Sequence, residues 1–141
     1  MSEKIVTYNI NGIRAAIRKR IDLWVKDFNP DILCLQEIKA NPDQFNIELF
    51  NSLGYQCYIH SAQKPGYSGV AIISKVIPTH IEYGCGIKEI DFEGRIIRAD
   101  YDKFSVMSVY FPSGSSGEKR QNFKMIFLDK FQQYIDKLKS R

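Results

Sequence analysis

The segment "PDILCLQEIK", residues 30–39, joins an apolar run directly to polar and charged side chains. Ile32 to Leu35 are all apolar, and Gln36 and Glu37 follow with no turn residue in between. An unbroken apolar run of this kind is typical of a parallel strand that is covered on both faces. A carboxylate at the end of such a strand is not required for fold stability. We therefore interpret Glu37 as a candidate functional residue.

The segments before this run predict a strand–helix–strand unit. Residues 4–10, "KIVTYNI", are rich in β-branched and aromatic residues, which is typical of a strand. After "NGIR", apolar residues recur at three- and four-residue spacing from Ile17 to Phe28, which indicates a helix packed on a sheet. Pro30 lies just beyond the expected helix end. Two strands joined in this way are expected to be parallel, with a right-handed crossover.

The rest of the chain continues the mixture of strands and helices. Further strands are expected at residues 55–60, 70–75, 79–84, 95–102 and 104–111, and helices at residues 41–54 and 118–140. One face of the last helix is expected to carry Phe123, Ile126, Phe127, Phe131, Tyr134, Ile135 and Leu138. The predicted fold class is α/β, a layered sandwich of mixed sheets flanked by helices.

The end of the chain bears on the domain organisation. It follows directly after a strongly amphipathic helix, where a further strand is expected. We therefore expect residues 1–141 to be the amino-terminal part of a single domain whose carboxyl-terminal part is missing. A naturally short domain that is closed by its last helix is the alternative.

Composition excludes several classes of protein. The 141 residues, 44% of them hydrophobic and 26% charged, are typical of one globular domain. No apolar run approaches the roughly 20 residues that a membrane-spanning helix needs, and the pattern of residues 1–10 does not lead us to expect secretion. Three widely spaced cysteines without a CxxC motif argue against a disulfide framework or zinc site. They fit reduced thiols, and we expect a cytoplasmic location.

The net charge of +4 is modest and does not by itself indicate a nucleic-acid partner. Its distribution is more informative. The segment "RAAIRKR", Arg14 to Arg20, places four cations in seven positions beside the end of the first strand. From charge alone, a solvated helix face is the simpler interpretation.

Three predicted strands end on polar groups: Asn9, Glu37 and Tyr110. In open α/β sheets, ligands bind outside the carboxyl ends of strands, so these side chains are candidates for one site. A carboxylate is a ligand that Mg²⁺ prefers, an amide can orient it, and a phenol can donate to an anionic oxygen. Each residue also has a structural interpretation: a turn at Asn9, an ion pair of Glu37 with Lys39, and a core aromatic at Tyr110.

The same segment resembles the first signature of the exonuclease III family of apurinic/apyrimidinic (AP) endonucleases. That pattern is an acid, an apolar strand, Gln-Glu, any residue and Lys, here Asp31 to Lys39. "YNINGIRAA", "WVKDFNPDIL", "GYSGVAIISK" and "EGRIIRADYDKFSVMSVYFPSG" resemble the family in the same order. The resemblance covers essentially the whole chain, but only the amino-terminal half to two-thirds of a typical member. It implies a DNase I-like fold of the endonuclease/exonuclease/phosphatase type.

The resemblance also implies roles for individual residues. Glu37 would be the principal Mg²⁺ ligand, with Mn²⁺ as a possible substitute. Asn9 would join the metal and catalytic cluster, and Tyr110 would face the scissile phosphate. The DNA-binding residues would be Arg14, Lys19, Lys39, Gly66 and Tyr67. The implied partner is double-stranded DNA with abasic sites or 3′ ends. The enzyme would cut the strand 5′ to an abasic site or remove nucleotides from the 3′ end. We expect a monomer that does not associate with a membrane.

The family's other catalytic groups, a Gly-Asp-x-Asn strand end and a Ser-Asp-His segment, are absent from the sequence. We therefore expect the chain alone to be nearly inactive. Asn11 stands where many relatives carry an acid, and Ser113 where many carry Asn. Two alternatives stay open: another Mg²⁺-dependent phosphodiesterase or phosphatase of the superfamily, and a truncated DNA-binding module without catalysis.

Overall fold

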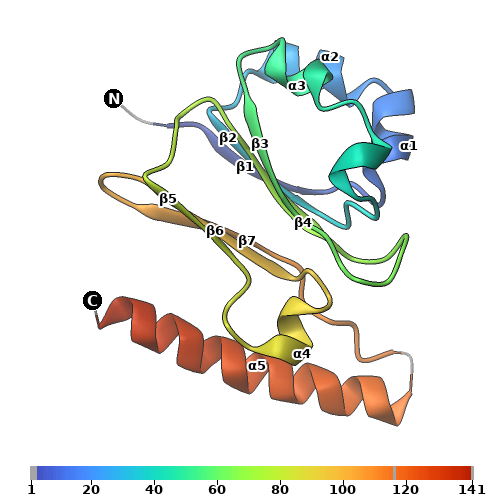
Figure 1. Ribbon diagram of the computed structural model, residues 1–141, viewed down its shortest axis with the longest axis vertical. Helices are drawn as coiled ribbons and strands as arrows, with labels where there is room; N and C mark the ends of the chain where they lie inside the picture. The colour runs from blue at the N-terminus through green and yellow to red at the C-terminus, as the bar shows by residue number, and fades with distance from the viewer. Residues whose placement is uncertain (1–2, 116, 141) are drawn as a thin grey trace. The chain divides into compact units, whose positions relative to one another are not determined.

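The computed structural model describes residues 3–115 and 117–140. The chain divides into two units, Met1–Tyr110 and Phe111–Arg141. The first unit contains two sheets and four short α-helices, and the second contains one long helix (Figure 1).

The first unit is a sandwich of two sheets. The four-stranded sheet has the order β1 (Ile5–Asn9), β2 (Ile32–Gln36), β4 (Val70–Ser74), β3 (Gln56–His60). The three-stranded sheet has the order β5 (His80–Tyr83), β6 (Ile96–Asp100), β7 (Ser105–Val109). β1 and β2 are parallel, and all other neighbouring pairs are antiparallel. The predicted mixed-sheet sandwich and the predicted parallel pair are confirmed.

Helices cover one face of the four-stranded sheet, and the three-stranded sheet covers the other (Figure 1). These helices are α1 (Ile13–Arg18), α2 (Ile21–Phe28) and α3 (Glu48–Asn51), preceded by a 3₁₀ turn at Pro42–Gln44. The predicted continuous helix up to Phe28 is wrong, because Arg20 adopts a left-handed conformation with φ of 65° and separates α1 from α2. A further short helix, α4 (Lys88–Asp91), lies between the strands predicted at residues 79–84 and 95–102, where the sequence predicts no helix.

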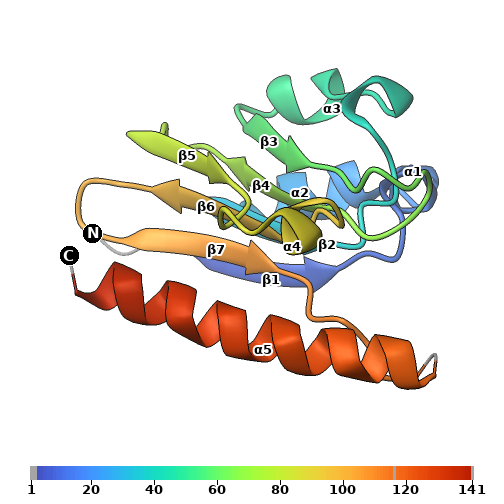
Figure 2. The ribbon, with the colours of Figure 1, turned by 60° about the horizontal axis from the view of Figure 1, so that its bottom comes forward.

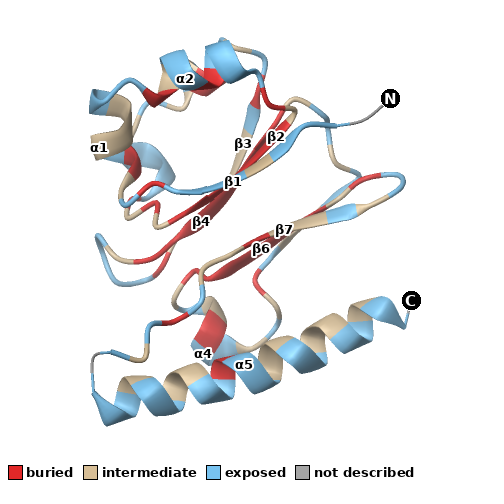
Figure 3. Ribbon diagram, turned by 180° about the vertical axis from the view of Figure 1, so that it is seen from behind, coloured by how far each residue is buried: buried red, intermediate tan, exposed pale blue. Residues whose placement is uncertain are grey.

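β2 lies at the centre of both apolar layers. Its five residues are all buried, as the apolar run predicts. Leu33 and Leu35 pack on the helix side with Ile13 and Val25. Residues of alternate parity pack between the sheets, in a cluster formed by Ile32, Cys34, Val70, Ile72, Ile97, Ala99 and Tyr101. Figure 3 shows this contrast: β2 and β4 are buried, whereas β1 is mostly exposed.

The second unit consists of a connecting segment and α5 (Glu118–Lys139). Phe127 is buried, and its ring lies 5.6 Å from that of Phe111 and 5.9 Å from that of Phe131. Ile126, which the sequence assigns to the apolar face, is 58% exposed, so that part of the prediction is wrong. In the described part of the chain, no helix is long and apolar enough to cross a membrane.

Candidate active site at the strand ends

The carboxyl ends of β1, β2 and β7 bring Asn9, Glu37 and Tyr110 together. In Figure 2 the arrows of β1 and β7 point toward the same end of the sandwich. Asn9 Nδ2 donates a hydrogen bond of 2.9 Å to Glu37 Oε1. Tyr110, the residue after β7, lies close enough to the Glu37 carboxylate for that charge to raise the pKa of its phenol. The three side chains that the sequence places at strand ends therefore meet at one carboxylate.

Gln36 fixes the two sheets to each other directly beneath this carboxylate. Its amide Nε2 donates to Thr7 Oγ1 at 2.9 Å in β1 and to Ser108 Oγ at 3.0 Å in β7. Ser108 Oγ in turn donates to the carbonyl of Leu35 at 2.8 Å. A buried network that is satisfied in this way rigidifies its surroundings. Sequence reasoning missed the role of Gln36, although the residue is part of the Gln-Glu pair that the resemblance highlighted.

The backbone at Glu37 is held in an uncommon conformation. Its φ is 56°, in the left-handed region that costs a non-glycine residue about 1–3 kcal/mol. Neighbouring main-chain hydrogen bonds hold it there: Gly12 N–H donates to the Glu37 carbonyl at 2.7 Å, and Ile38 N–H donates to the Gly69 carbonyl at 3.1 Å. Such strain persists only when the surroundings over-determine it, and it clusters at functional sites.

Lys39 neutralises the carboxylate in this arrangement. Its ammonium Nζ lies 3.4 Å from Glu37 Oε2 and donates to Asn11 Oδ1 at 2.6 Å. The ion pair that the sequence offered as the structural interpretation of Glu37 is thus present. It does not replace the functional interpretation, because Asn9 donates to the same carboxylate and Tyr110 lies near enough for the Glu37 charge to raise its pKa.

The side chains at this site could supply some, but not all, of the ligands of one divalent ion. Mg²⁺ is usually held by one or two carboxylates and retains several waters, so Glu37 can supply one ligand. No cluster of three or more His, Cys, Asp or Glu side chains suited to a metal occurs among the described residues. Asn9 Oδ1 accepts the Asn11 N–H at 3.1 Å, which turns the amide nitrogen toward Glu37. In this geometry Asn9 orients the carboxylate, and its role as a ligand stays a prediction.

Burial raises the pKa of the Tyr110 phenol above its ordinary value of 10.0, and the Glu37 charge raises it further. The Arg95 guanidinium acts in the opposite direction. Tyr110 is therefore protonated at neutral pH. Its hydroxyl can donate a hydrogen bond to an anionic oxygen.

Arg95 connects Tyr110 to the loop that carries Tyr67. Its side chain is 2% exposed and donates to Glu93 Oε1 at 2.8 Å. It also donates to the Tyr110 carbonyl at 3.0 Å and to the Tyr67 hydroxyl at 2.9 Å, and its guanidinium lies over both rings. Sequence reasoning missed this residue as well, because nothing in its local context distinguishes a buried arginine from an exposed one.

The predicted DNA-binding residues occupy different places. Arg14 donates to the Lys39 carbonyl at 3.1 Å and so lies beside the candidate site. Gly66 and Tyr67 lie in one loop, where Gly66 has φ of 66°. Lys19 lines a separate pocket along β1. The cationic run is not one solvated helix face, since it spans the break between α1 and α2 and ends in an ion pair of Arg20 with Asp22.

Comparison with known proteins identifies the family. Residues 6–140 match the model of the Endonuclease/Exonuclease/phosphatase family. The chain belongs to this family. The resemblance to exonuclease III and AP endonucleases is therefore confirmed. Members of the family are generally nucleases that depend on a divalent metal.

Curated relatives carry DNA repair names. The chain is 42% identical to Recombination repair protein 1 of Drosophila melanogaster, over 96% of this chain and 20% of that protein. It is 37% identical to Exodeoxyribonuclease of Bacillus subtilis, over 94% and 52%, and 35% identical to DNA repair nuclease APEX1 of Danio rerio, over 98% and 45%. The chain spans about half the length, or less, of these relatives.

Solved structures give the same result for the fold. An AP endonuclease from Archaeoglobus fulgidus is similar with a TM-score of 0.85 and 31% identity, covering 96% of this chain and 52% of that one. The 3′ phosphatase NExo from Neisseria, bound to a product DNA hairpin, has a TM-score of 0.87 and 26% identity, covering 99% and 54%.

Proposed function

We propose that this chain supplies the Asn9–Glu37–Tyr110 part of the active site of a Mg²⁺-dependent DNA repair nuclease. The enzyme would hydrolyse the phosphodiester 5′ to an abasic site and act as a 3′-to-5′ exodeoxyribonuclease. The observation that carries the proposal is that Asn9 and Tyr110, from the ends of strands in two different sheets, both lie at the Glu37 carboxylate. The names of the relatives support the choice of DNA as substrate.

Each residue has a task in phosphoryl transfer. A bound Mg²⁺ would neutralise charge on the phosphate and the leaving oxygen. Glu37 would hold it, in an orientation set by the Asn9 amide. The protonated Tyr110 hydroxyl would donate to a phosphate oxygen as charge develops there. Arg14 and Lys39, which lie beside the carboxylate, would contact DNA phosphates irrespective of sequence.

We further propose that residues 1–141 form the amino-terminal part of the catalytic domain. None of these three side chains is left to take a proton from the attacking water, since Glu37 is assigned to the metal, the Asn9 amide is not basic and the Tyr110 phenol is protonated. The Gly-Asp-x-Asn and Ser-Asp-His groups that the family uses are absent from the sequence. The chain alone is therefore expected to cut an abasic-site duplex far more slowly than intact Bacillus subtilis exodeoxyribonuclease.

The test joins residues 1–141 to the part of the Bacillus subtilis enzyme that lies beyond the matched region. The fusion should cut an abasic-site duplex in Mg²⁺ in preference to intact duplex, inositol phosphate or phospholipid. Glu37→Gln should abolish cutting and leave DNA binding largely intact. Glu89→Gln, which makes the same charge change at an exposed position of α4, is the control. Unchanged cutting by Glu37→Gln would remove Glu37 from the site, and equal cutting of a phospholipid would favour the alternative phosphodiesterase.

A further inference from the structure

Each oxygen of the Glu37 carboxylate faces a polar side chain. The Asn9 amide donates to Oε1 at 2.9 Å, and the Lys39 ammonium lies 3.4 Å from Oε2. A divalent ion that is held by this carboxylate therefore lies near both partners. An ammonium carries a full positive charge and an amide carries only a dipole, so Lys39 opposes the ion more strongly than Asn9 does.

The Asn9 amide is held at both ends. Asn9 is the last residue of β1 and is paired in register with Gln36 of β2. Its Nδ2 donates to Glu37, and its Oδ1 accepts the Asn11 N–H at 3.1 Å. We therefore expect Asn9 to keep its position when an ion binds to the carboxylate.

Lys39 is fixed along its main chain but not along its side chain. Its N–H donates to the Ser68 carbonyl at 2.9 Å, and its carbonyl accepts from Arg14 Nη2 at 3.1 Å. The side chain is 34% exposed and has a flexible four-carbon stem. The ammonium can therefore leave Glu37 while the backbone stays in place, and an ion pair with this exposure is weak.

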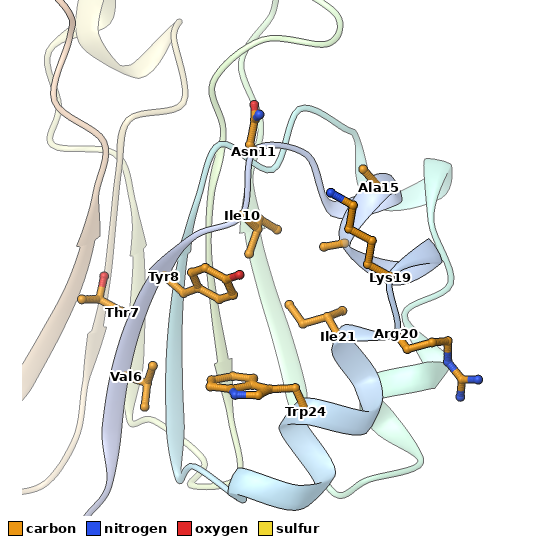
Figure 4. Close-up of a pocket in the computed structure, with 11 residues that line it drawn as sticks. Val6, Thr7, Tyr8, Ile10, Asn11, Ala15, Lys19, Arg20, Ile21 and Trp24 are labelled. Carbon is orange, nitrogen blue, oxygen red and sulfur yellow. The ribbon is translucent and has the colours of Figure 1, made fainter.

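Asn11 provides the other contact of the ammonium. Lys39 Nζ donates to Asn11 Oδ1 at 2.6 Å. Asn11 is exposed, and Figure 4 shows it at one end of the pocket along β1. Its amide is neutral, and a carboxylate at this position would hold the ammonium more strongly. Water can take the place of the ammonium at this exposed amide.

We propose that Lys39 competes with the divalent ion for Glu37 and that its ammonium moves to a DNA phosphate once the ion is bound. The proposal rests on the proposed function, which assigns Glu37 to the ion and Lys39 to the DNA. Repulsion between the two cations drives the ammonium away from the carboxylate, and the phosphate is the anion that the substrate brings to this place. Ion and DNA should then each raise the affinity for the other, because coupling between two binding sites is reciprocal.

The first experiment measures metal binding by the chain itself, with Mn²⁺ as the probe and the electron paramagnetic resonance signal of the unbound ion as the readout. Lys39→Met removes the ammonium and keeps an unbranched side chain. It should tighten Mn²⁺ binding about two- to fivefold, the range that exposed ion pairs give. Unchanged or weaker binding would overturn the proposal. Equal binding of Mn²⁺ by the parent chain and by Glu37→Gln would place the ion elsewhere, with the same result.

The matched control is Lys19→Met. Lys19 is also exposed, and Figure 4 shows it across the pocket from β1, so the variant makes the same charge change away from the carboxylate. It should bind Mn²⁺ as the parent chain does. Equal tightening in both variants would reflect net charge alone and would overturn the proposal.

The second experiment measures the affinity for an abasic-site duplex with and without Mg²⁺. Lys39→Met should bind as the parent chain does without Mg²⁺, but about two- to fivefold more weakly in its presence, because only then does the ammonium reach a phosphate. Lys19→Met should weaken binding by one factor in both conditions. A loss in Lys39→Met that is the same with and without Mg²⁺ would indicate a permanent phosphate contact and would overturn the proposal.

The parent chain tests the proposal if Lys39→Met fails to fold. The ¹⁵N resonance of the Lys39 ammonium should shift when Mg²⁺ is added, whereas that of Lys26, exposed on α2, should not. No shift at Lys39 would overturn the proposal.

Cleavage by the fusion with the Bacillus subtilis segment is scored separately. Cutting of abasic-site DNA without an effect of Lys39 on Mn²⁺ affinity supports the proposed function and contradicts the exchange. The exchange without cutting supports the role of Lys39 and contradicts the proposed function.

Discussion

β1 and β2 are hydrogen-bonded neighbours in one sheet, yet their surroundings are opposite. All five residues of β2 are buried, and four of the five residues of β1 are exposed. Each strand nevertheless delivers one residue to the same site, Glu37 after β2 and Asn9 at the end of β1. The two residues are therefore held in different ways. Burial on both faces fixes the strand before Glu37, whereas hydrogen bonds with Glu37 and Asn11 fix Asn9.

The largest effect on stability is expected when a core side chain is removed from β2. Leu33 is 0% exposed, so Leu33→Ala should lower the free energy of unfolding by about 2–5 kcal/mol, from lost burial and the cavity left behind. Urea unfolding followed by circular dichroism measures the change. A loss below about 1 kcal/mol would show that β2 is not the rigid element described here.

A smaller effect is expected at the junction between the sheets. Gln36→Ala removes the hydrogen bonds to Thr7 and Ser108, and the free energy of unfolding should fall by about 1–3 kcal/mol. Gln63→Ala, at an exposed loop position, should change it by no more than about 0.5 kcal/mol and serves as the control. Equal effects of the two substitutions would mean that Gln36 does not hold the sheets together.

The same type of change on β1 should cost less. Tyr8 is 48% exposed and contacts Trp24, so Tyr8→Ala should lower the free energy of unfolding by less than about 1.5 kcal/mol in the isolated chain. An effect as large as that of Leu33→Ala would contradict the exposed position of β1.

The smallest effect is a pH dependence. The pKa of Tyr110 is raised in the folded chain, so above the unfolded value of about 10 the folded state retains a proton that the unfolded state loses. Stability should therefore fall as pH rises through the folded pKa. Tyr110→Phe should show a shallower alkaline decline in urea titrations at pH 9 and 11. An identical decline in both chains would place Tyr110 in an ordinary aqueous environment.

The strands and the candidate site could be predicted because both depend on local pattern. The apolar run of β2 identifies a strand buried on both faces, and the polar residue after each strand follows from where the strand ends. Asn9 and Glu37 meet because parallel strands end at one edge. Tyr110 lies beside them only because the two sheets stack on each other. The sequence predicts that the sheets are layered, but not how their strands align.

The features that were missed depend on conformation or on distant partners. The break between α1 and α2 lies at Arg20, where a positive φ has no signal in residue type. Gln36 and Ser108 are 72 positions apart, and their hydrogen bond exists only once the sheets stack. Ile126 shares a helical face with buried residues but is exposed, since periodicity identifies a face and not the extent to which it is covered.

The left-handed backbone at the candidate site has a consequence for which residues can occupy it. Asn11, Glu37, Lys39 and Ser68 all have φ between 48° and 56°. Valine, isoleucine and threonine tolerate this region poorly, because their branched Cβ clashes with the main chain. At these four positions the backbone conformation disfavours β-branched residues, whatever the charge or metal-binding ability of the side chain. Variant libraries built on this chain should lose β-branched residues there even when no reaction is selected for.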